Sequence, residues 1–223
     1  MTTVSLAGAD RRADSQRNRR ALLEAAARAF AEGGIDVPAD EIARRAGVAK
    51  GTLFRHFPTK RALVSEVLVD RLVALQAAVA EISAARPPGL GALAELMSRG
   101  AEVLAADRSF FDAATCEGFA DERLERAKRE LQAALDGLVA AAQSSGEVRT
   151  DVTGADIAML MMAATNTCAP AHELQPQLWR RYLALMIDGL RPQSTTLPPA
   201  VSARRRTGRP PAREGIRAGP TNP

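Results

Sequence analysis

The segment from Ile42 to Phe57 constrains the fold more than any other part of this chain, because it predicts two short helices joined by a tight turn. Apolar residues recur at positions i, i+1 and i+4 on either side of the turn, which gives each helix one buried face. Between them stands Gly47, and glycine readily takes the left-handed backbone that ends a helix. The apolar positions are Ile42, Ala43 and Ala46 before the turn, and Leu53, Phe54 and Phe57 after it.

The outward face of the second short helix carries Lys50, Thr52, Arg55 and His56. A short helix with an apolar back and a basic, hydroxyl-bearing front fits the major groove of DNA. The alternative is an ordinary helical corner whose basic face is only solvated. This segment alone leaves both interpretations open.

The flanking sequence extends the pattern. An apolar helical stripe between Leu22 and Phe30 stops at a pair of glycines, and Thr59 is placed to cap the helix that follows the motif. With these flanks, residues 17–69 resemble the N-terminal DNA-binding domain of the TetR family of bacterial transcriptional regulators. The matching positions are Ala25, Ala26, Phe30, Gly34, Ile42, Ala43, Ala46, Gly47, Val48, Gly51, Thr52, Leu53, Phe54, His56, Phe57 and Lys60.

This resemblance implies an all-α protein in which a three-helix helix-turn-helix domain precedes a helical domain that binds a small effector and forms a homodimer. The implied DNA partner is a double-stranded, palindromic operator, and no cofactor or metal is implied. The positions expected to contact DNA are Lys50, Gly51, Thr52, Phe54, Arg55, His56, Thr59 and Lys60.

Two departures from the family pattern affect the DNA contacts. Phe54 stands where members usually carry tyrosine, which removes one hydroxyl that could bond a phosphate. Pro38 and its neighbours stand where a helix-capping serine or threonine is common, so Asp36 or Asp40 is expected to help cap that helix.

Charge is distributed unevenly along the 223 residues. Residues 11–61 carry twelve Lys and Arg against six Asp and Glu, residues 62–190 carry eleven against eighteen, and residues 191–223 carry seven against one. Basic segments release counterions from DNA, whereas an acidic middle is repelled by it. Cys116 and Cys168 lack metal-ligand spacing and are expected to be reduced thiols of a cytoplasmic protein. The longest apolar stretch, residues 157–164, is too short to span a membrane.

The helical periodicity predicts about nine helices, because alanine and arginine are abundant and no alternating strand pattern occurs. We expect a disordered arm over residues 1–14, the helix-turn-helix domain over 15–60 and the effector-binding and dimerisation domain over 61–190. Residues 191–223 should form a disordered basic tail, since they contain seven prolines and few apolar residues. The tail's Gly208-Arg209-Pro210 resembles the core of an AT-hook.

The resemblance implies that the last two helices form the dimer interface, and they carry more apolar surface than the terminal helices of a monomer need. The candidate residues are Ile157, Leu160, Met161, Ala164, Trp179, Tyr182, Leu183, Met186 and Ile187. The alternative is that both faces pack within their own subunit.

An effector pocket needs apolar walls with a few polar groups, and few aromatic or charged residues favour a lipophilic effector. The candidate residues are Met97, Phe110, Phe111, Phe119, Met159, Met162, Thr165, Asn166 and His172. Ordinary helical core is the alternative for each of them.

These observations predict a ligand-responsive regulator, in particular a repressor released from its operator by the effector. One alternative is a constitutive DNA-binding regulator without a ligand switch. A helical enzyme is the other, but the chain shows no nucleophile elbow, no phosphate-binding glycine loop and only two histidines.

Overall fold

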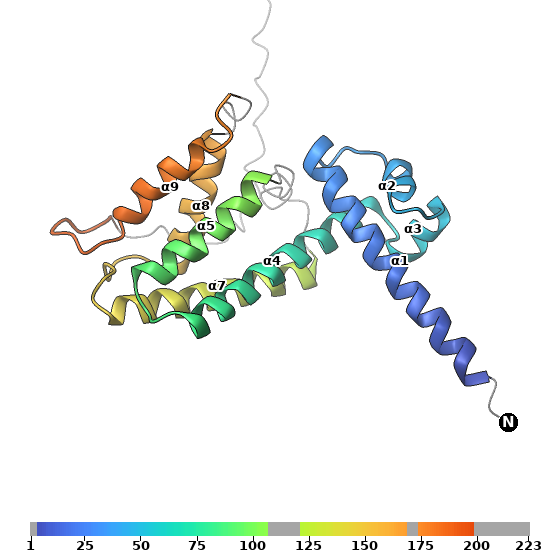
Figure 1. The fold of residues 1–223 in the computed structure, drawn as a ribbon, viewed down its shortest axis with the longest axis horizontal. Coiled ribbons are helices and arrows are strands. Elements are labelled where there is room, and N and C mark those ends of the chain that lie inside the picture. Colours follow the sequence, from blue (N-terminus) through green and yellow to red (C-terminus); the bar gives the residue numbers. More distant parts are fainter. Residues whose placement is uncertain (1–3, 107–120, 169–173, 199–223) are drawn as a thin grey trace, which may run out of the picture.

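The computed structural model describes residues 4–106, 121–168 and 174–198, which form eight helices and no strand. The expected all-α fold is confirmed. The expected count of about nine helices is close to the eight that the described residues form. Figure 1 shows an elongated molecule in which three N-terminal helices stand at one end of a long connecting helix.

The head domain consists of α1 (Val4–Gly33), α2 (Ala39–Arg45) and α3 (Lys50–His56). Helix α1 stops at Gly33, and Gly34 follows with a left-handed φ of 72°. The start of α1 differs from the expected disordered arm, because the helix runs from Val4. Residues 4–14 contain no proline, and extending an existing helix by one residue costs far less than nucleating a new one.

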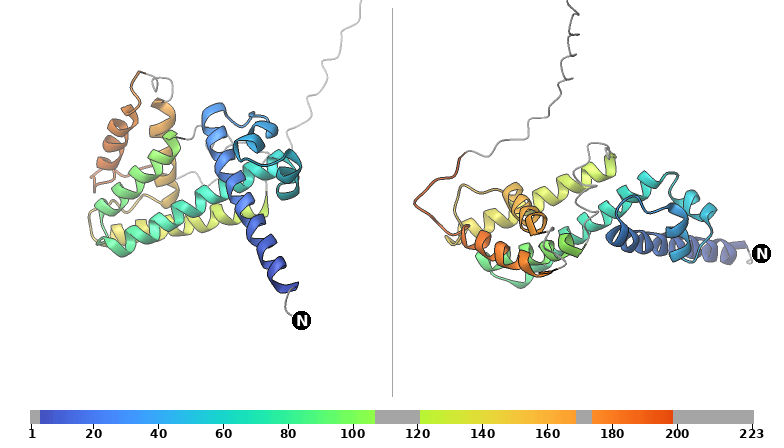
Figure 2. Two further views of the ribbon diagram at one scale, coloured as in Figure 1. Left: turned by 45° about the vertical axis from the view of Figure 1, so that its right-hand side comes forward. Right: turned by 90° about the horizontal axis from the view of Figure 1, so that it is seen from above.

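Helix α4 (Lys60–Ala85) belongs to both domains. The Thr59 hydroxyl accepts a hydrogen bond from the backbone N–H of Ala62 at 3.0 Å, so the predicted cap is confirmed. Figures 1 and 2 show α4 leaving the head domain and running side by side with α7 (Glu122–Ser144). The chain after α4 reads Arg86-Pro87-Pro88, which cannot continue a helix.

The second domain adds α5 (Leu90–Ala106), α8 (Gly154–Cys168) and α9 (Leu178–Asp188) to α4 and α7. Helix α8 packs against α5, α7 and α9. Carboxylates cap two helix starts: Glu147 accepts from the Leu90 N–H and Asp136 from the Gly154 N–H, each at 2.9 Å. Among the described helices, none combines the length and the apolar character that crossing a bilayer requires.

Two apolar clusters hold the molecule together. The head cluster takes its members from α1, α2 and α3, from α4 as far as Val69, and from Leu124 and Ala127 of α7. The first turns of α4 therefore complete the head core, although the sequence predicted a domain boundary at residue 60. The second cluster joins α4, α5, α7, α8 and α9 and includes Cys168, whose burial raises the pKa of its thiol.

The basic tail is described only as far as residue 198. Its first residues differ from the expected disorder, because they are bonded to the loop between α7 and α8. The Arg149 guanidinium donates to the Thr195 carbonyl oxygen at 2.7 Å, and the Leu197 N–H donates to Asp151 at 2.7 Å. The AT-hook-like segment lies outside the described residues.

Candidate nucleic-acid interface and ligand cavity

The turn between α2 and α3 has the geometry that the sequence predicted. Gly47 has a φ of 69°, a left-handed value that few L residues tolerate. The Val48 N–H donates to the Ala43 carbonyl at 3.0 Å, and the Gly47 N–H donates to the Arg44 carbonyl at 3.1 Å. These two bonds satisfy the last carbonyls of α2 and fix the direction in which α3 leaves.

Helix α3 presents one buried side and one open side. Leu53 and the following Phe57 are fully buried in the head cluster, and Phe54 is half-buried against it. The remaining side chains point away from this core: Lys50, Gly51 and Arg55 are exposed, and Thr52 and His56 are half-buried. The structure thus brings six of the eight expected DNA contacts onto one seven-residue helix.

The other two expected contacts, Thr59 and Lys60, stand at the start of α4. Thr59 is exposed and Lys60 is half-buried. The oxygen of the Thr59 hydroxyl accepts the capping hydrogen bond of α4. Its O–H group can still donate a hydrogen bond to another acceptor, such as a DNA phosphate.

An ion pair crosses the face of the helix-turn-helix, and the sequence reasoning missed it. Lys50 lies 2.7 Å from a carboxylate oxygen of Asp40, and both side chains are mostly exposed. The expected capping role of Asp36 or Asp40 is wrong, since Pro38 is the N-cap of α2 and no side chain caps that helix. Asp40 instead holds the ammonium group of a candidate base reader.

A second ion cluster ties α2 to the end of α1. Glu41 accepts hydrogen bonds from Arg44 and Arg45, and Arg45 also reaches Glu32 of α1 at 2.5 Å. The guanidinium groups of Arg44 and then Arg45 lower the pKa of Glu41 to about 2. Arg45 thereby links α2 to the end of α1.

The head domain is joined to the second domain through Glu66 of α4. Its carboxylate, largely buried, pairs with Arg19 of α1 at 2.5 Å and with Arg123 of α7. One residue earlier, the Ser65 hydroxyl donates to Asp121 at 2.7 Å, which with the Arg123 N–H lowers the pKa of that carboxyl. The start of α7 is thereby bonded to the part of α4 that completes the head core.

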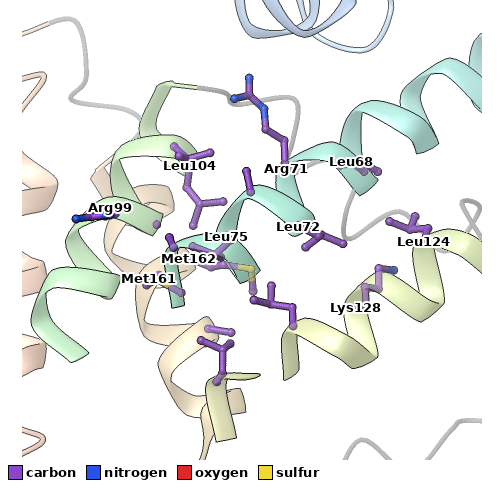
Figure 3. A pocket seen from close by; sticks show the side chains of 17 residues that line it. Leu68, Arg71, Leu72, Leu75, Arg99, Leu104, Leu124, Lys128, Met161 and Met162 are labelled. Carbon is purple, nitrogen blue, oxygen red and sulfur yellow. The ribbon is translucent and has the colours of Figure 1, made fainter. Parts of the chain in front are cut away.

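An apolar cavity of about 370 Å³ opens in the second domain between α4, α5, α7 and α8 (Figure 3). Leu124 lines it and lies next to Arg123, so the cavity adjoins the ion pairs of Glu66. The lining residues are Leu68, Arg71, Leu72, Ala74, Leu75, Ala78, Arg99, Gly100, Val103, Leu104, Leu124, Lys128, Leu131, Leu135, Ala158, Met161 and Met162.

Of the expected pocket residues that the structure describes, only Met162 lines this cavity. Met97 is fully buried elsewhere in the core. The Thr165 hydroxyl donates to the backbone carbonyls of Met161 and Met162. Met159 is 60% exposed, and Asn166 is exposed as well, so both point away from the cavity. The other expected residues, Phe110, Phe111, Phe119 and His172, lie outside the described residues.

The expected dimer residues divide into two groups. Five are buried in the core of their own subunit: Ile157, Met161, Ala164, Trp179 and Leu183. Leu160, Met186 and Ile187 are half-buried against the same core, whereas Tyr182 is 43% exposed. The apolar side chains that α8 and α9 leave most open are Met159 and Leu185.

A basic helix-turn-helix, joined by one continuous helix to an all-helical domain with an apolar cavity, defines a class of two-domain helix-turn-helix proteins. The family model for bacterial regulatory proteins of the tetR family matches residues 22–67. The model for the C-terminal domain of SbtR-like transcriptional regulators matches residues 87–192.

Solved structures give the same result. A TetR regulatory protein from Mycobacterium vanbaalenii is 39% identical, with a TM-score of 0.61 over 81% of this chain and 99% of that chain. A TetR regulator from Streptomyces coelicolor is 32% identical, with a TM-score of 0.61 over 79% of this chain and 99% of that chain. The chain therefore belongs to the TetR family of bacterial transcriptional regulators, which are DNA-binding proteins and not enzymes.

The fold extends to more distant proteins. The regulator FadR from Bacillus subtilis, solved in complex with stearoyl-CoA, is 19% identical. Its TM-score is 0.60 over 76% of this chain and 98% of that chain.

Proposed function

We propose that this chain is a ligand-responsive repressor that binds a palindromic operator as a homodimer and is released by a small lipophilic effector. The observation that carries the proposal is that α4 completes the head core with its first turns and lines the cavity with its later ones. A constitutive regulator does not require an apolar cavity beside its connecting helix. The cavity therefore favours the ligand-responsive function over the constitutive alternative.

On DNA, α3 would enter the major groove with Lys50 and Thr52 reading bases. Arg55 would face the groove beside them. Phe54, His56 and Lys60 would position the head domain against phosphates, Phe54 by contact alone. Lys60→Ala should weaken binding to all sequences alike and lower the salt slope by about one unit. Lys50→Ala should instead change which operator is preferred, measured by selection from a random DNA library. Equal losses on operator and random DNA would remove Lys50 from the base readers.

A palindromic operator requires two heads, and the exposed apolar side chains of α8 and α9 support a dimer through these helices. Met159, Tyr182 and Leu185 are the candidates that the subunit core leaves open. Leu185→Glu should give monomers in light scattering and a large loss of operator affinity. The matched control is Leu174→Glu, because Leu174 is 88% exposed and precedes α9. A dimeric Leu185→Glu variant would exclude this face.

The switch would work through the tilt of α4. An effector shifts the balance between two arrangements only by its differential affinity for them, and a hundredfold weaker operator complex requires about 2.7 kcal/mol. The stearoyl-CoA complex of the Bacillus subtilis protein supports a lipophilic occupant for a domain of this fold.

The test adds lipophilic compounds to the operator complex and follows its release by fluorescence anisotropy. Ala158→Trp should fill the cavity and abolish the response while leaving operator affinity intact. Ala140→Trp, on the exposed side of α7, is the control. A normal response in the Ala158 variant would place the effector site elsewhere, and no response to any compound would support the constitutive alternative.

A further inference from the structure

The cavity lining is chemically one-sided. Fourteen of its seventeen described side chains are leucine, alanine, valine, methionine or glycine, and the other three are Arg71, Arg99 and Lys128. Within the described part of the chain, no carboxylate, hydroxyl, amide or imidazole side chain lines it. Among the described residues, the polar side chains that border the cavity are therefore all cationic donors.

This lining selects the polar group of the occupant. Burying a polar group without a hydrogen-bond partner is costly, and Arg and Lys side chains offer donors but no acceptor. A cationic ligand group would be repelled, and a neutral hydroxyl would gain only a weaker bond. An anionic group would form charge-assisted hydrogen bonds, which are about twice as strong as neutral ones.

The three cations are not equivalent. Arg99 already pairs with Glu81 and Glu95, and in Figure 3 its side chain points away from the other labelled residues. Lys128 is half-buried, with one wall of the cavity formed by its own helix α7. Lys128 pairs at 3.0 Å with Glu125, which lies three residues earlier on the same helix and is 47% exposed. A pair of this kind is worth less than about 1 kcal/mol, so it exchanges easily for a ligand carboxylate.

The size of the cavity restricts the apolar part. Ligand pockets range over roughly 300–1,000 Å³, and this cavity of about 370 Å³ stands at the small end. Met161 and Met162 add flexible side chains that adapt to a flexible occupant. A single hydrocarbon chain fits this description better than a bulky multi-ring compound.

We propose that the cavity binds an amphipathic anion of the fatty-acid type, with its chain among the leucines and methionines and its carboxylate on Lys128. Arg71, on helix α4, also borders the cavity. This assignment rests on the proposed ligand-responsive function, because it names the effector class of that same site. It also explains how a bound ligand would affect the domain junction. Leu124 and Lys128 belong to the first turns of α7, and Asp121 and Arg123 bond the start of that helix to α4.

The experiment compares three probes with one chain and different head groups: dodecanoate, dodecanol and dodecylamine. Binding to the full-length protein is measured by calorimetry, without DNA. Wild-type protein should bind dodecanoate about tenfold or more tightly than dodecanol, and dodecylamine weakest. Lys128→Met should remove the preference for dodecanoate over dodecanol, and Lys128→Arg should keep it. Arg129→Met is the matched control, because Arg129 is the exposed neighbour outside the cavity lining.

Failure of the assignment and failure of the switch give different results. Equal affinity for dodecanoate and dodecanol, no binding of dodecanoate, or a preference retained by a folded Lys128→Met variant would each overturn the assignment. Operator release is then measured separately. Dodecanoate that binds through Lys128 without releasing the operator supports the assignment and contradicts the repressor switch. Release by uncharged lipophiles alone contradicts the assignment and supports the switch.

Discussion

The head domain and the second domain bury the same kinds of side chain but pack them differently. In the head cluster, Phe30, Leu53 and Phe57 are each 2% exposed or less and meet around a turn of fixed geometry. In the second domain, leucines of α4, α5 and α7 surround an open cavity of about 370 Å³. A closed core holds recognition side chains in one arrangement, whereas a core with space can change when a ligand fills it.

The largest expected effect tests this difference in packing. Leu53→Ala should lower the free energy of unfolding by about 3 kcal/mol, because it removes a fully buried side chain from a closed core. Leu104→Ala should cost less than about 1.5 kcal/mol, because Leu104 is half-buried and already borders the cavity. Urea unfolding followed by circular dichroism measures both. Equal losses would mean that the cavity is not open in solution.

The junction between the two regions gives the next effect. Glu66→Gln removes the charge that holds Arg19 and Arg123 to α4, so operator affinity should persist while the effector response falls. Coupling between two sites is typically worth about 1–3 kcal/mol, or roughly 5- to 150-fold in affinity. Operator binding with and without effector measures it. Glu130→Gln is the control, since Glu130 pairs with Arg126 on the exposed side of α7. A normal effector response in the Glu66 variant would exclude these ion pairs from the switch.

Glycine substitutions should change the stability of the two regions by smaller amounts and in opposite directions. Gly47→Ala should destabilise the head by about 1–2 kcal/mol, because an L residue is strained at a φ of 69°. Gly137→Ala should stabilise the second domain by about 0.5–1 kcal/mol, because Gly137 is exposed within α7 and a Cβ there meets nothing within 4 Å. Thermal unfolding of the two variants gives the two signs. The same sign for both would contradict the left-handed turn.

The ion pair on the DNA-facing side predicts a gain of function. Asp40→Asn should tighten operator binding a few-fold, because it frees Lys50 and removes a negative charge near the phosphates. The gain should shrink as salt rises. Asp188→Asn, which breaks an exposed pair with Arg191 at the end of α9, should leave operator affinity unchanged. Anisotropy titrations at two salt concentrations measure both, and weaker binding by Asp40→Asn would show that the carboxylate orients Lys50 productively.

The smallest effect is a pH dependence of folding stability, which has opposite signs for Glu41 and Asp70. The pKa of Glu41 lies at about 2, below its ordinary value of 4.5, so its pairs stabilise the head above pH 4.5 and are lost as the pH falls toward 2. Burial, and then Glu66, raise the pKa of Asp70 on α4, so its ionisation destabilises the fold as the pH rises above its ordinary value of 3.8. Glu41→Gln should flatten the acid limb of unfolding, and Asp70→Asn should raise stability at neutral pH. A Glu41→Gln variant with an unchanged acid limb, or an Asp70→Asn variant less stable at neutral pH, would contradict these pKa shifts.

The two regions also differ in how far the sequence predicted them. The turn at Gly47, the buried Leu53 and Phe57 and the Thr59 cap were all predicted, because each depends on residues at most five positions apart. The Lys50 to Asp40 pair was missed, although the charges were visible, because its partners stand on different helices. In the second domain the all-helical character was predicted, but of the expected pocket residues that the structure describes only Met162 lines the cavity.

The sequence by itself determined the family, the all-α class, the turn at Gly47 and the buried face of the helix that follows it. These follow from local backbone preferences and from the spacing of apolar residues along one helix. Only the tertiary structure decided that Met161 and Lys128 border the cavity and that Met159 faces solvent. Helical periodicity marks a residue as apolar-facing, but several helices compete to cover each face of α8. Which helix covers a given face of α8 depends on how segments far apart in the chain pack together.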